Sequence, residues 1–508
     1  MMAGFARFCR RPLVVWLVAL AVFLAALPWF SRDLGFSWHF HADEGGKIAQ
    51  VQMGERNFHH PLLMLHCVQG VVALTGANSS PHAIVLAGRW VAVVAMALAC
   101  ALLVAAVGMS HGAGWGLVLG VLLLLHPACF TYAHYFKEDP MLLAGLALAI
   151  LGVAVAGQGG RGWRRGCLIT GCGLGLALGS KYIGIVWWPF VLAALAAHAP
   201  VPQARRAGWL LAFGLAVAIV LIIQLPAFVH AGQFTAAVSS EVTKATKDSV
   251  GAEDSGSVVQ IYWAGMRRMP LVAFAALALA GTVVAAGFRR WPAFWLGLSS
   301  WGYLAILCAA TKEADRYLLP WHVAVTVATV VIIAAICRSI GTRLRGYWRV
   351  LPAVVALALL VDVASDLRDL QKIAVNGFRN MDRRVDAIEF IRKELPAGAV
   401  VFYGTRVGLV DPAYPEQYPA ALAMLPQQVR YVPEPWTYGT VAGMRAAGAT
   451  HYLVSEEFER AERMSRIEEK QAFFRDFRQH AKLIQQFKRG SKSQFPMRLS
   501  LYDLAGDR

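Results

Sequence analysis

Residues 83–107 read AIVLAGRWVAVVAMALACALLVAAV, an apolar run in which Arg89 is the one charged residue. A helix of about 20 apolar residues crosses the roughly 30 Å hydrocarbon core of a bilayer, so this run is predicted to be a transmembrane helix. The composition of the whole chain agrees. Hydrophobic residues make up 57% and charged residues 16%, whereas soluble domains carry charge on about 25% of their residues. The chain is therefore predicted to be an α-helical polytopic membrane protein.

Further apolar runs of similar character bring the total to about eleven predicted crossings. They are residues 12–30, 115–133, 140–156, 166–180, 183–199, 208–228, 269–287, 292–310, 317–337 and 350–365. Arg7, Arg10 and Arg11 precede the first run, and no small-residue cleavage site follows it. This run is therefore predicted to stay as a span and not to be removed as a signal peptide. Residues 61–76 are apolar but short, which favours an interfacial or re-entrant helix.

Basic residues in the short connections indicate the orientation. With a cytoplasmic N-terminus, the arginine clusters fall on the inner side, as the positive-inside rule requires. They are Arg7, Arg10, Arg11, Arg161, Arg164, Arg165, Arg205, Arg206, Arg289, Arg290, Arg338, Arg343, Arg345 and Arg349. The net charge of +17 thus reflects topology, and no basic tract with interleaved aromatics predicts nucleic-acid binding. The acids before residue 350 all fall outside, either as a functional face or because they avoid the basic connections.

After residue 365 the long apolar runs stop and charges become frequent, so residues 366–508 are predicted to form a soluble α/β domain on the outer side. The patterns predict a helix at 382–395, strands at 399–403, 451–454 and 497–502, and a charged amphipathic helix within 456–488. No catalytic motif occurs in this part. The chain has eight cysteines, none in its last third and none in a CxxC pair, so neither a disulfide framework nor a zinc cluster is predicted.

Just beyond the first predicted span, residues 39–47 read HFHADEGGK. Charged groups near the hydrocarbon are costly unless they are solvated or used, and two adjacent carboxylates point in different directions. Asp43 is therefore predicted to accept a proton from an incoming hydroxyl, while Glu44 orients the site. The alternative is a solvated pair of acids in a loop.

Three more outer loops carry candidate groups. Asp139 precedes a proline at the start of a span, as a second acid of the site or as a helix cap. Lys181 ends a glycine-rich helix, where it could grip a lipid phosphate or snorkel to the interface. Lys312, Arg316 and Tyr317 lie on the outer side, against the positive-inside bias. Lysine and arginine donate charge-assisted hydrogen bonds to phosphate oxygens, so a phosphate-binding loop is predicted there.

Histidines 39, 41, 59, 60 and 66 lie near the acidic pair, but no spacing such as HExxH predicts a metal site. Solvated or hydrogen-bonded histidines are the favoured interpretation. No cofactor is predicted, and a need for a divalent metal stays open.

In this order and on one membrane side, these motifs resemble the C-type glycosyltransferases. The branch is that of the dolichyl-phosphate-mannose protein mannosyltransferases and the bacterial lipid A aminoarabinose transferases. The resemblance rests on the acidic pair, His60-Pro61-Leu62, the arginine that opens the next span, Asp139-Pro140, the run from Gly175 to Lys181, and the loop from Asp315 to Pro320. It covers residues 1–365, the predicted membrane unit. It implies an inverting transfer of one sugar from a polyprenyl-phosphate donor to an acceptor hydroxyl outside the cytoplasm.

Carried over by position, the resemblance implies that Asp43 is the base and that Glu44 and Asp139 shape the acceptor and sugar region. It places Lys181, Lys312, Arg316 and Tyr317 at the carrier phosphate, and His60 and Arg89 are further candidates for substrate binding. Residues 229–268 could form a mobile loop that closes over the carrier. The acceptor, whether lipid, glycan or protein, is not predicted.

The sequence departs from the family in places. Leu62 stands where a second proline is usual, and Trp187-Trp188 is followed by Pro189 and not by aspartate. The second difference argues against transfer of a whole oligosaccharide. There is also no room for the extra repeat domain of eukaryotic protein mannosyltransferases, so a bacterial inner-membrane protein is expected. Two other functions stay open: a transporter or lipid flippase, and a membrane-anchored scaffold whose C-terminal domain is the working part.

Overall fold

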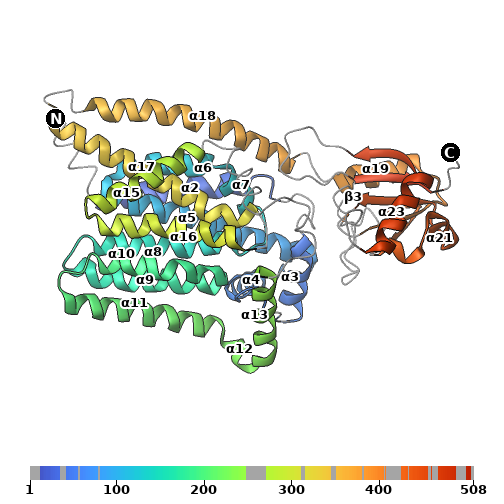
Figure 1. Cartoon of the computed structure of the whole chain (residues 1–508), viewed down its shortest axis with the longest axis horizontal. Coiled ribbons are helices and arrows are strands. Elements are labelled where there is room, and N and C mark those ends of the chain that lie inside the picture. Colours follow the sequence, from blue (N-terminus) through green and yellow to red (C-terminus); the bar gives the residue numbers. More distant parts are fainter. Residues whose placement is uncertain are drawn as a thin grey trace.

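The structure is a computed structural model, and it describes residues 12–34, 42–54, 56, 58–77, 80–246, 271–310, 315–344, 350–379, 383–404, 407, 425–432, 434–455, 459, 467–487 and 499–504. A bundle of helices is followed by a small domain with one β-sheet (Figure 1). The helices of the bundle are α2 (Pro12–Phe30), α3 (Ala42–Gln52), α4 (Leu63–Thr75), α5 (Pro81–His111), α6 (Ala113–Leu125), α7 (Pro127–Ala133), α8 (Asp139–Ala156), α9 (Arg161–Ser180), η2 (Tyr182–Trp187), α10 (Trp188–Ala196), α11 (Pro202–Ile223), α12 (Leu225–Val229), α13 (Ala231–Thr246), α15 (Leu271–Gly287), α16 (Trp291–Ala309), η3 (Asp315–Leu318), α17 (Leu319–Arg343) and α18 (Leu351–Arg379).

The polytopic membrane class is confirmed, but the predicted number of crossings is not. Within the described ranges, 6 helices are long and apolar enough to cross a membrane, or 7 if one bent pair counts as a single span. That pair is α6 and α7, which meet at an angle of 61° inside the predicted span 115–133. The break lies at His126, whose ring accepts a hydrogen bond from Ala128 N at 3.2 Å, and Pro127 begins the new helix. A proline in the first turn favours such a restart, which a count of apolar residues does not detect.

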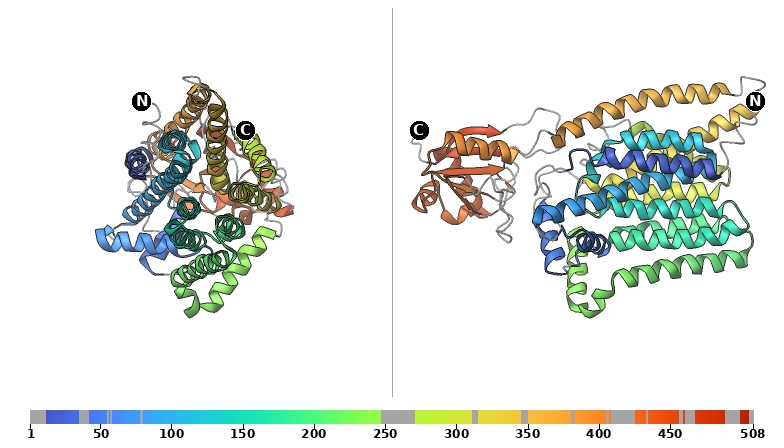
Figure 2. Two further views of the ribbon diagram at one scale, coloured as in Figure 1. Left: turned by 90° about the vertical axis from the view of Figure 1, so that its left-hand side faces the viewer. Right: turned by 180° about the vertical axis from the view of Figure 1, so that it is seen from behind.

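Other predicted spans are also divided. The predicted span 183–199 is a 3₁₀ turn followed by the short helix α10, and the predicted span 208–228 is α11 followed by α12. The predicted mobile loop 229–268 begins as helix α13, so its first part was predicted wrongly, and residues 247–268 lie outside the described residues. Helices α3 and α13 lie across one end of the bundle, the end from which the chain enters the sheet domain (Figures 1 and 2). This end is called the site end below.

Glycines bring α8 and α9 unusually close together. A Cβ atom at Gly145 of α8 would lie 2.5 Å from the backbone nitrogen of Ala177 on α9, and one at Gly173 of α9 would collide with the backbone of Ala149 on α8. Small residues allow helix backbones to approach in this way. The two helices therefore bring the start of α8 and the end of α9 side by side at the site end.

The C-terminal sheet has five strands in the order β2-β1-β3-β5-β4. The strands are β1 (Val400–Tyr403), β2 (Gln428–Tyr431), β3 (His451–Ser455), β4 (Lys482–Phe487) and β5 (Leu499–Asp503). Strand β1 runs parallel to β2 and β3, whereas β5 is antiparallel to β3 and β4. Successive side chains of a strand point to opposite faces. Val401 accordingly packs against helix α19 (Arg383–Glu394), and Phe402 packs on the other face with α21 (Val441–Ala446) and α23 (Glu468–His480).

The α/β character of this domain is confirmed, as are the predicted helix at 382–395 and the three predicted strands. The amphipathic helix predicted within 456–488 was too long, because α23 ends at His480 and residues 482–487 form strand β4. Strand β4 lies at the edge of the sheet and is mostly exposed, and its sequence KLIQQF does not alternate between apolar and polar residues. Helix α18 continues through residue 365 to Arg379. The proposed division of the chain into units at that residue stays a prediction.

Candidate functional site

A buried ion pair fixes the start of helix α3. The guanidinium of Arg89 on α5 donates to both carboxylate oxygens of Glu44, from Nε at 3.1 Å and from Nη2 at 2.8 Å. The backbone N–H of Phe136 adds a third hydrogen bond to Glu44 at 2.9 Å. Both side chains are buried, with 0% of Glu44 and 1% of Arg89 exposed. A buried ion pair needs this bidentate geometry and these extra hydrogen bonds to offset its loss of hydration.

One turn further along α3, Lys47 makes a second buried connection. Its Nζ donates to the carboxylate of Glu138 and, at 2.9 Å, to the carbonyl oxygen of Phe136. Burial would raise the pKa of Glu138, but nearby positive charge, first of all that of Lys47, outweighs this effect and holds its pKa well below the ordinary value. Glu138 therefore stays ionised and ties α3 to the start of α8.

Asp139, Lys181 and Tyr317 meet at the site end of the bundle. Lys181 Nζ lies 2.5 Å from Asp139 Oδ1 and 4.3 Å from the centroid of the Tyr317 ring. Tyr303 donates a hydrogen bond to the carbonyl oxygen of Tyr317 at 2.8 Å, which holds the turn η3 in place. The second oxygen of Asp139 is buried and has no hydrogen-bond partner among the described residues. Asp139 thus keeps one acceptor available for a ligand.

Lys137 and Arg316 add positive charge around this pair. Burial, followed by the neighbouring charge of Arg316, lowers the pKa of Lys137 to about 7. Glu138 raises the pKa of His60, but burial and Lys47 outweigh it and lower the pKa below its ordinary value, so His60 is neutral near pH 7. Apart from the paired Lys47 and Glu138, the described basic side chains of this region (Lys137, Lys181 and Arg316) outnumber its described carboxylate (Asp139). Such an excess is suited to an anion, because a bound phosphate would balance it.

The structure brings together five of the predicted site residues: His60, Asp139, Lys181, Arg316 and Tyr317. Glu44 and Arg89 lie beside them and pair with each other, a contact that fixes α3 and is compatible with the orienting role expected of Glu44. The expected roles of both residues at the substrate stay predictions. The backbone of Asp43 lies in α3, and its side chain is outside the described part of the chain. Lys312 is likewise outside the described residues.

Sequence reasoning missed Lys47, Lys137 and Glu138 as members of the site. A signal was present, because Lys47 follows Asp43 by one helical turn, and Lys137-Glu138 directly precedes Asp139.

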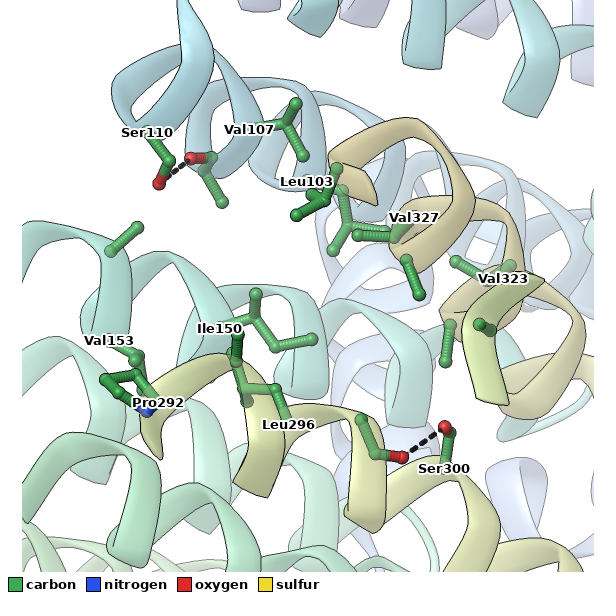
Figure 3. A pocket seen from close by; sticks show the side chains of 18 of the residues that line it. Leu103, Val107, Ser110, Ile150, Val153, Pro292, Leu296, Ser300, Val323 and Val327 are labelled. Atoms are coloured by element: carbon green, nitrogen blue, oxygen red, sulfur yellow. Dashed lines mark hydrogen bonds between the residues drawn. The ribbon is translucent and has the colours of Figure 1, made fainter. Parts of the chain in front are cut away.

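An apolar cavity of about 270 Å³ extends through the bundle between α5, α8, α16 and α17 (Figure 3). On α17 it is lined from Pro320 to Ile332, and at about 1.5 Å per residue this gives it a depth of about 18 Å. Its two lining residues nearest the ionic cluster are Leu143, one turn after Asp139 on α8, and Pro320, three residues after Tyr317. The cavity therefore begins close to the basic side chains and continues into the part of the bundle expected to lie in lipid.

A second cavity, of about 850 Å³, lies at the site end between α3 and α13. It is lined by polar side chains together with glycine and alanine. No group of three or more His, Cys, Asp or Glu residues suited to a metal ion is found among the residues with a described placement.

With this geometry in view, comparisons with known proteins identify the fold. The structure is similar to that of ArnT from Cupriavidus metallidurans bound to undecaprenyl phosphate, with a TM-score of 0.52 at 16% identity. The similarity covers 98% of this chain and 99% of the ArnT chain. It is also similar to the archaeal oligosaccharyltransferase AglB from Archaeoglobus fulgidus, with a TM-score of 0.50 at 12% identity over 95% of the chain and 76% of that protein. The chain has the fold of the C-type glycosyltransferases.

Within this class, residues 69–240 match the family model of dolichyl-phosphate-mannose-protein mannosyltransferases. The resemblance to the protein mannosyltransferase and ArnT branch is thereby confirmed. No curated protein gives a significant sequence match to the chain. Fold and family match together support a membrane glycosyltransferase.

Proposed function

We propose that this chain is an inverting glycosyltransferase of a bacterial inner membrane, with its N-terminus in the cytoplasm and the site end of the bundle outside. It would move a single sugar from a polyprenyl-phosphate donor to an acceptor hydroxyl. The observation that carries the proposal is the excess of described basic side chains around Asp139, next to one end of an apolar cavity. A lipid phosphate combines the same two properties, an anionic head and an apolar chain.

The donor phosphate would lie against Lys181 and Arg316, with Lys137 nearby. When the bond between the sugar C1 and the phosphate oxygen breaks, the leaving phosphate gains negative charge. Fixed cations stabilise that charge more strongly in the transition state than in the ground state. The first part of the isoprenoid chain would enter the apolar cavity between Leu143 and Pro320. The cavity is shorter than the ~30 Å hydrocarbon core, so the rest of the chain would lie in the bilayer.

Asp43 would be the general base. It would take the proton of the acceptor hydroxyl while that oxygen bonds to C1 from the face opposite the leaving phosphate, which inverts the anomeric centre. General-base assistance of this kind contributes roughly 10²–10⁴-fold to rate. Glu44 and Arg89 hold α3 in place, and Lys47 holds the next turn, so the backbone of residue 43 is fixed beside the ionic cluster.

A transporter or flippase would be expected to bind its cargo near the middle of the membrane. The buried ion pairs of this chain that involve α3, α8 and α9 instead lie at one end of the bundle. This arrangement favours chemistry at a membrane surface.

The Asp43→Asn variant tests the proposal. It should still be protected against heat by undecaprenyl phosphate, because the phosphate site is unchanged, but its sugar transfer in membranes should fall about 10²-fold or more. The matched control is Asp369→Asn, which removes an exposed carboxylate of helix α18 and should leave transfer unchanged. Wild-type transfer by Asp43→Asn would remove Asp43 as the base, and a loss of protection by undecaprenyl phosphate would point to misfolding of the site.

A further inference from the structure

Helix α18 runs along the side of the bundle from one end to the other (Figures 1 and 2). Far from the site end, the thiol of Cys337 on α17 donates to the carbonyl oxygen of Pro352 on α18 at 3.3 Å. Towards the site end, the side-chain amide of Gln371 on α18 donates to the carbonyl oxygen of Leu124 at 2.5 Å, and the indole of Trp29 on α2 donates to the same oxygen at 3.0 Å. At about 1.5 Å per residue, the stretch from Pro352 to Gln371 is about 28 Å long, close to the roughly 30 Å hydrocarbon core. This part of α18 therefore lies at the depth of the membrane.

One face of α18 packs on the bundle and the opposite face does not. The buried positions recur at helical spacing and form one stripe: Ala356, Leu360, Leu367, Gln371 and Ala374. A second set, also spaced by three or four residues, shares the opposite face, and all of its members are exposed: Val355, Leu359, Asp362, Asp366 and Asp369. This exposed face, from Val355 to Asp366, is called the acidic face of α18 below. It combines apolar side chains with carboxylates.

Asp362 lies near the middle of the membrane. It is about 15 Å along the helix from Pro352 and about 13 Å from Gln371, the two residues that fix the depth of α18. Lysine and arginine can extend a long side chain to the membrane surface, but the short side chain of aspartate cannot. Asp369, nearer the site end, is paired with Lys372 at 2.7 Å. Asp362 and Asp366 have no ion-pair partner among the residues with a described placement.

A carboxylate that faces lipid at this depth is costly, and such groups are found where they are paired or used. Neither of the two cavities described above includes a residue of α18. Lipid head groups are about 15 Å away on either side, at half the hydrocarbon thickness. A second copy of the chain docked through the same face would bring like charges together. The group of opposite charge that can reach Asp362 is therefore a basic side chain on another transmembrane helix.

The surroundings of Asp362 suit a helix as the partner. Ala358 and Ser365 lie one turn before and one turn after it, and both are small and exposed. Small residues allow a neighbouring helix to approach closely, and hydrogen bonds between polar side chains then hold the two helices together. Leu359, with 65% of its surface exposed, adds apolar contact area beside the carboxylate.

We propose that the acidic face of α18 docks a transmembrane helix of another membrane protein, and that this helix carries a lysine or arginine near its middle. The carboxylate of Asp362 would accept a charge-assisted hydrogen bond from that side chain, while Val355 and Leu359 pack against the apolar part of the helix. The inference goes beyond the reaction proposed above and does not depend on it, because no residue of α18 belongs to the ionic cluster or lines the two cavities.

Synthetic helices of defined sequence test this face. The full-length chain, labelled with a donor fluorophore, is placed in phosphatidylcholine vesicles with acceptor-labelled peptides of about 20 leucine and alanine residues, long enough to span the bilayer. A peptide with one central lysine should bind about tenfold more tightly than the same peptide with a central leucine, as measured by energy transfer. Equal binding of the two peptides would overturn the proposal.

Three substitutions locate the interaction. Asp362→Leu should abolish the preference for the lysine peptide, and Asp362→Lys should reverse it in favour of a peptide with a central glutamate. The matched control is Asp369→Leu, which removes an acid from the same side of the helix nearer its site end and should leave the preference intact. Asp362→Leu should not lower the thermal midpoint in the same vesicles, because it removes a charge from lipid, and this measurement shows that the variant is folded.

Two further outcomes would contradict the proposal. An unchanged preference for the lysine peptide in folded Asp362→Leu would place its binding elsewhere on the protein. Energy transfer between donor- and acceptor-labelled copies of the chain, without peptide, that is lost in Asp362→Leu would assign the acidic face to self-association.

Discussion

Glu44 and Arg89 are 45 positions apart in the chain, yet they form a bidentate ion pair with distances of 2.8 and 3.1 Å in the interior of the bundle. The pair joins α3, which carries the proposed base, to the long helix α5. A mechanism that depends on residue 43 therefore also depends on a contact that is buried in the bundle, with 0% of Glu44 and 1% of Arg89 exposed.

The first prediction concerns this pair. Arg89→Met leaves the Glu44 carboxylate buried without its partner and should cost about 3–5 kcal/mol of stability. We expect a large fall in the thermal midpoint, measured by size-exclusion chromatography of heated samples. In the double variant Glu44→Leu/Arg89→Met no charge is left buried, so much of the midpoint should return while sugar transfer stays low. A single variant as stable as the unsubstituted chain would show that the pair does not anchor α3.

The second prediction is a pH dependence of donor binding. The pKa of Lys137 is about 7, far below its ordinary value, so the side chain is protonated below pH 7 and loses its charge above it. A bound phosphate favours the protonated form and raises this pKa. Carrier affinity should therefore weaken above pH 7, by up to about tenfold per pH unit until the raised pKa is passed. Lys137→Arg keeps its charge and should flatten the profile between pH 7 and 9. A flat profile for the unsubstituted chain would exclude Lys137 from the phosphate site.

The third prediction separates the roles of Lys181 and Lys47. Lys181→Met removes a cation of the proposed phosphate site and should weaken binding of undecaprenyl phosphate about 10-fold or more. Lys47→Met is the matched control, because that lysine is buried beneath the site against Glu138. It should mainly lower the thermal midpoint. Equal losses of affinity in the two variants would mean that both lysines affect carrier binding by stabilising the protein, and that Lys181 does not contact the phosphate.

The fourth prediction tests the apolar cavity of Figure 3. Val327→Phe fills part of this cavity and should weaken binding of undecaprenyl phosphate while inorganic phosphate binding is unchanged. Ile336→Phe adds the same ring to the same helix at an exposed position that does not line the cavity, and should have no effect. Carrier binding by Val327→Phe at full strength would show that the isoprenoid chain lies elsewhere.

The broad class of the fold could be predicted from sequence, because apolar length is a direct requirement of the bilayer. The divisions inside the spans could not. The break at His126 depends on a local cap and on Pro127, and the chain is apolar on both sides of it. In the sheet domain, buried strands such as β3 were recognised by their β-branched and aromatic residues. Strand β4 was not, because it owes its conformation to pairing with β5 and not to its own composition.

Only part of the candidate site could be predicted, because residue types are visible in the sequence and contacts between distant segments are not. Asp139, Lys181 and Arg316 were recognised by their residue types in outward loops. That Glu44 pairs with Arg89, or Lys47 with Glu138, depends on contacts between segments about 45 and 91 positions apart. No periodicity in the sequence encodes such distances. The sequence therefore indicated which side chains are available, and the fold shows which of them pair with one another.

The glycines between α8 and α9 have a consequence for natural variation and for mutational scans. Gly145 lies about 9 Å along α8 from Asp139, and Gly173 about 12 Å along α9 from Lys181, at about 1.5 Å per residue. Neither contacts the ionic cluster, yet the close approach they permit sets the separation of the two helix ends that bear Asp139 and Lys181. In a screen for loss of sugar transfer, these two positions should be as intolerant as the charged residues themselves, and a map of intolerant positions would extend from the membrane surface deep into the lipid-embedded part of the protein.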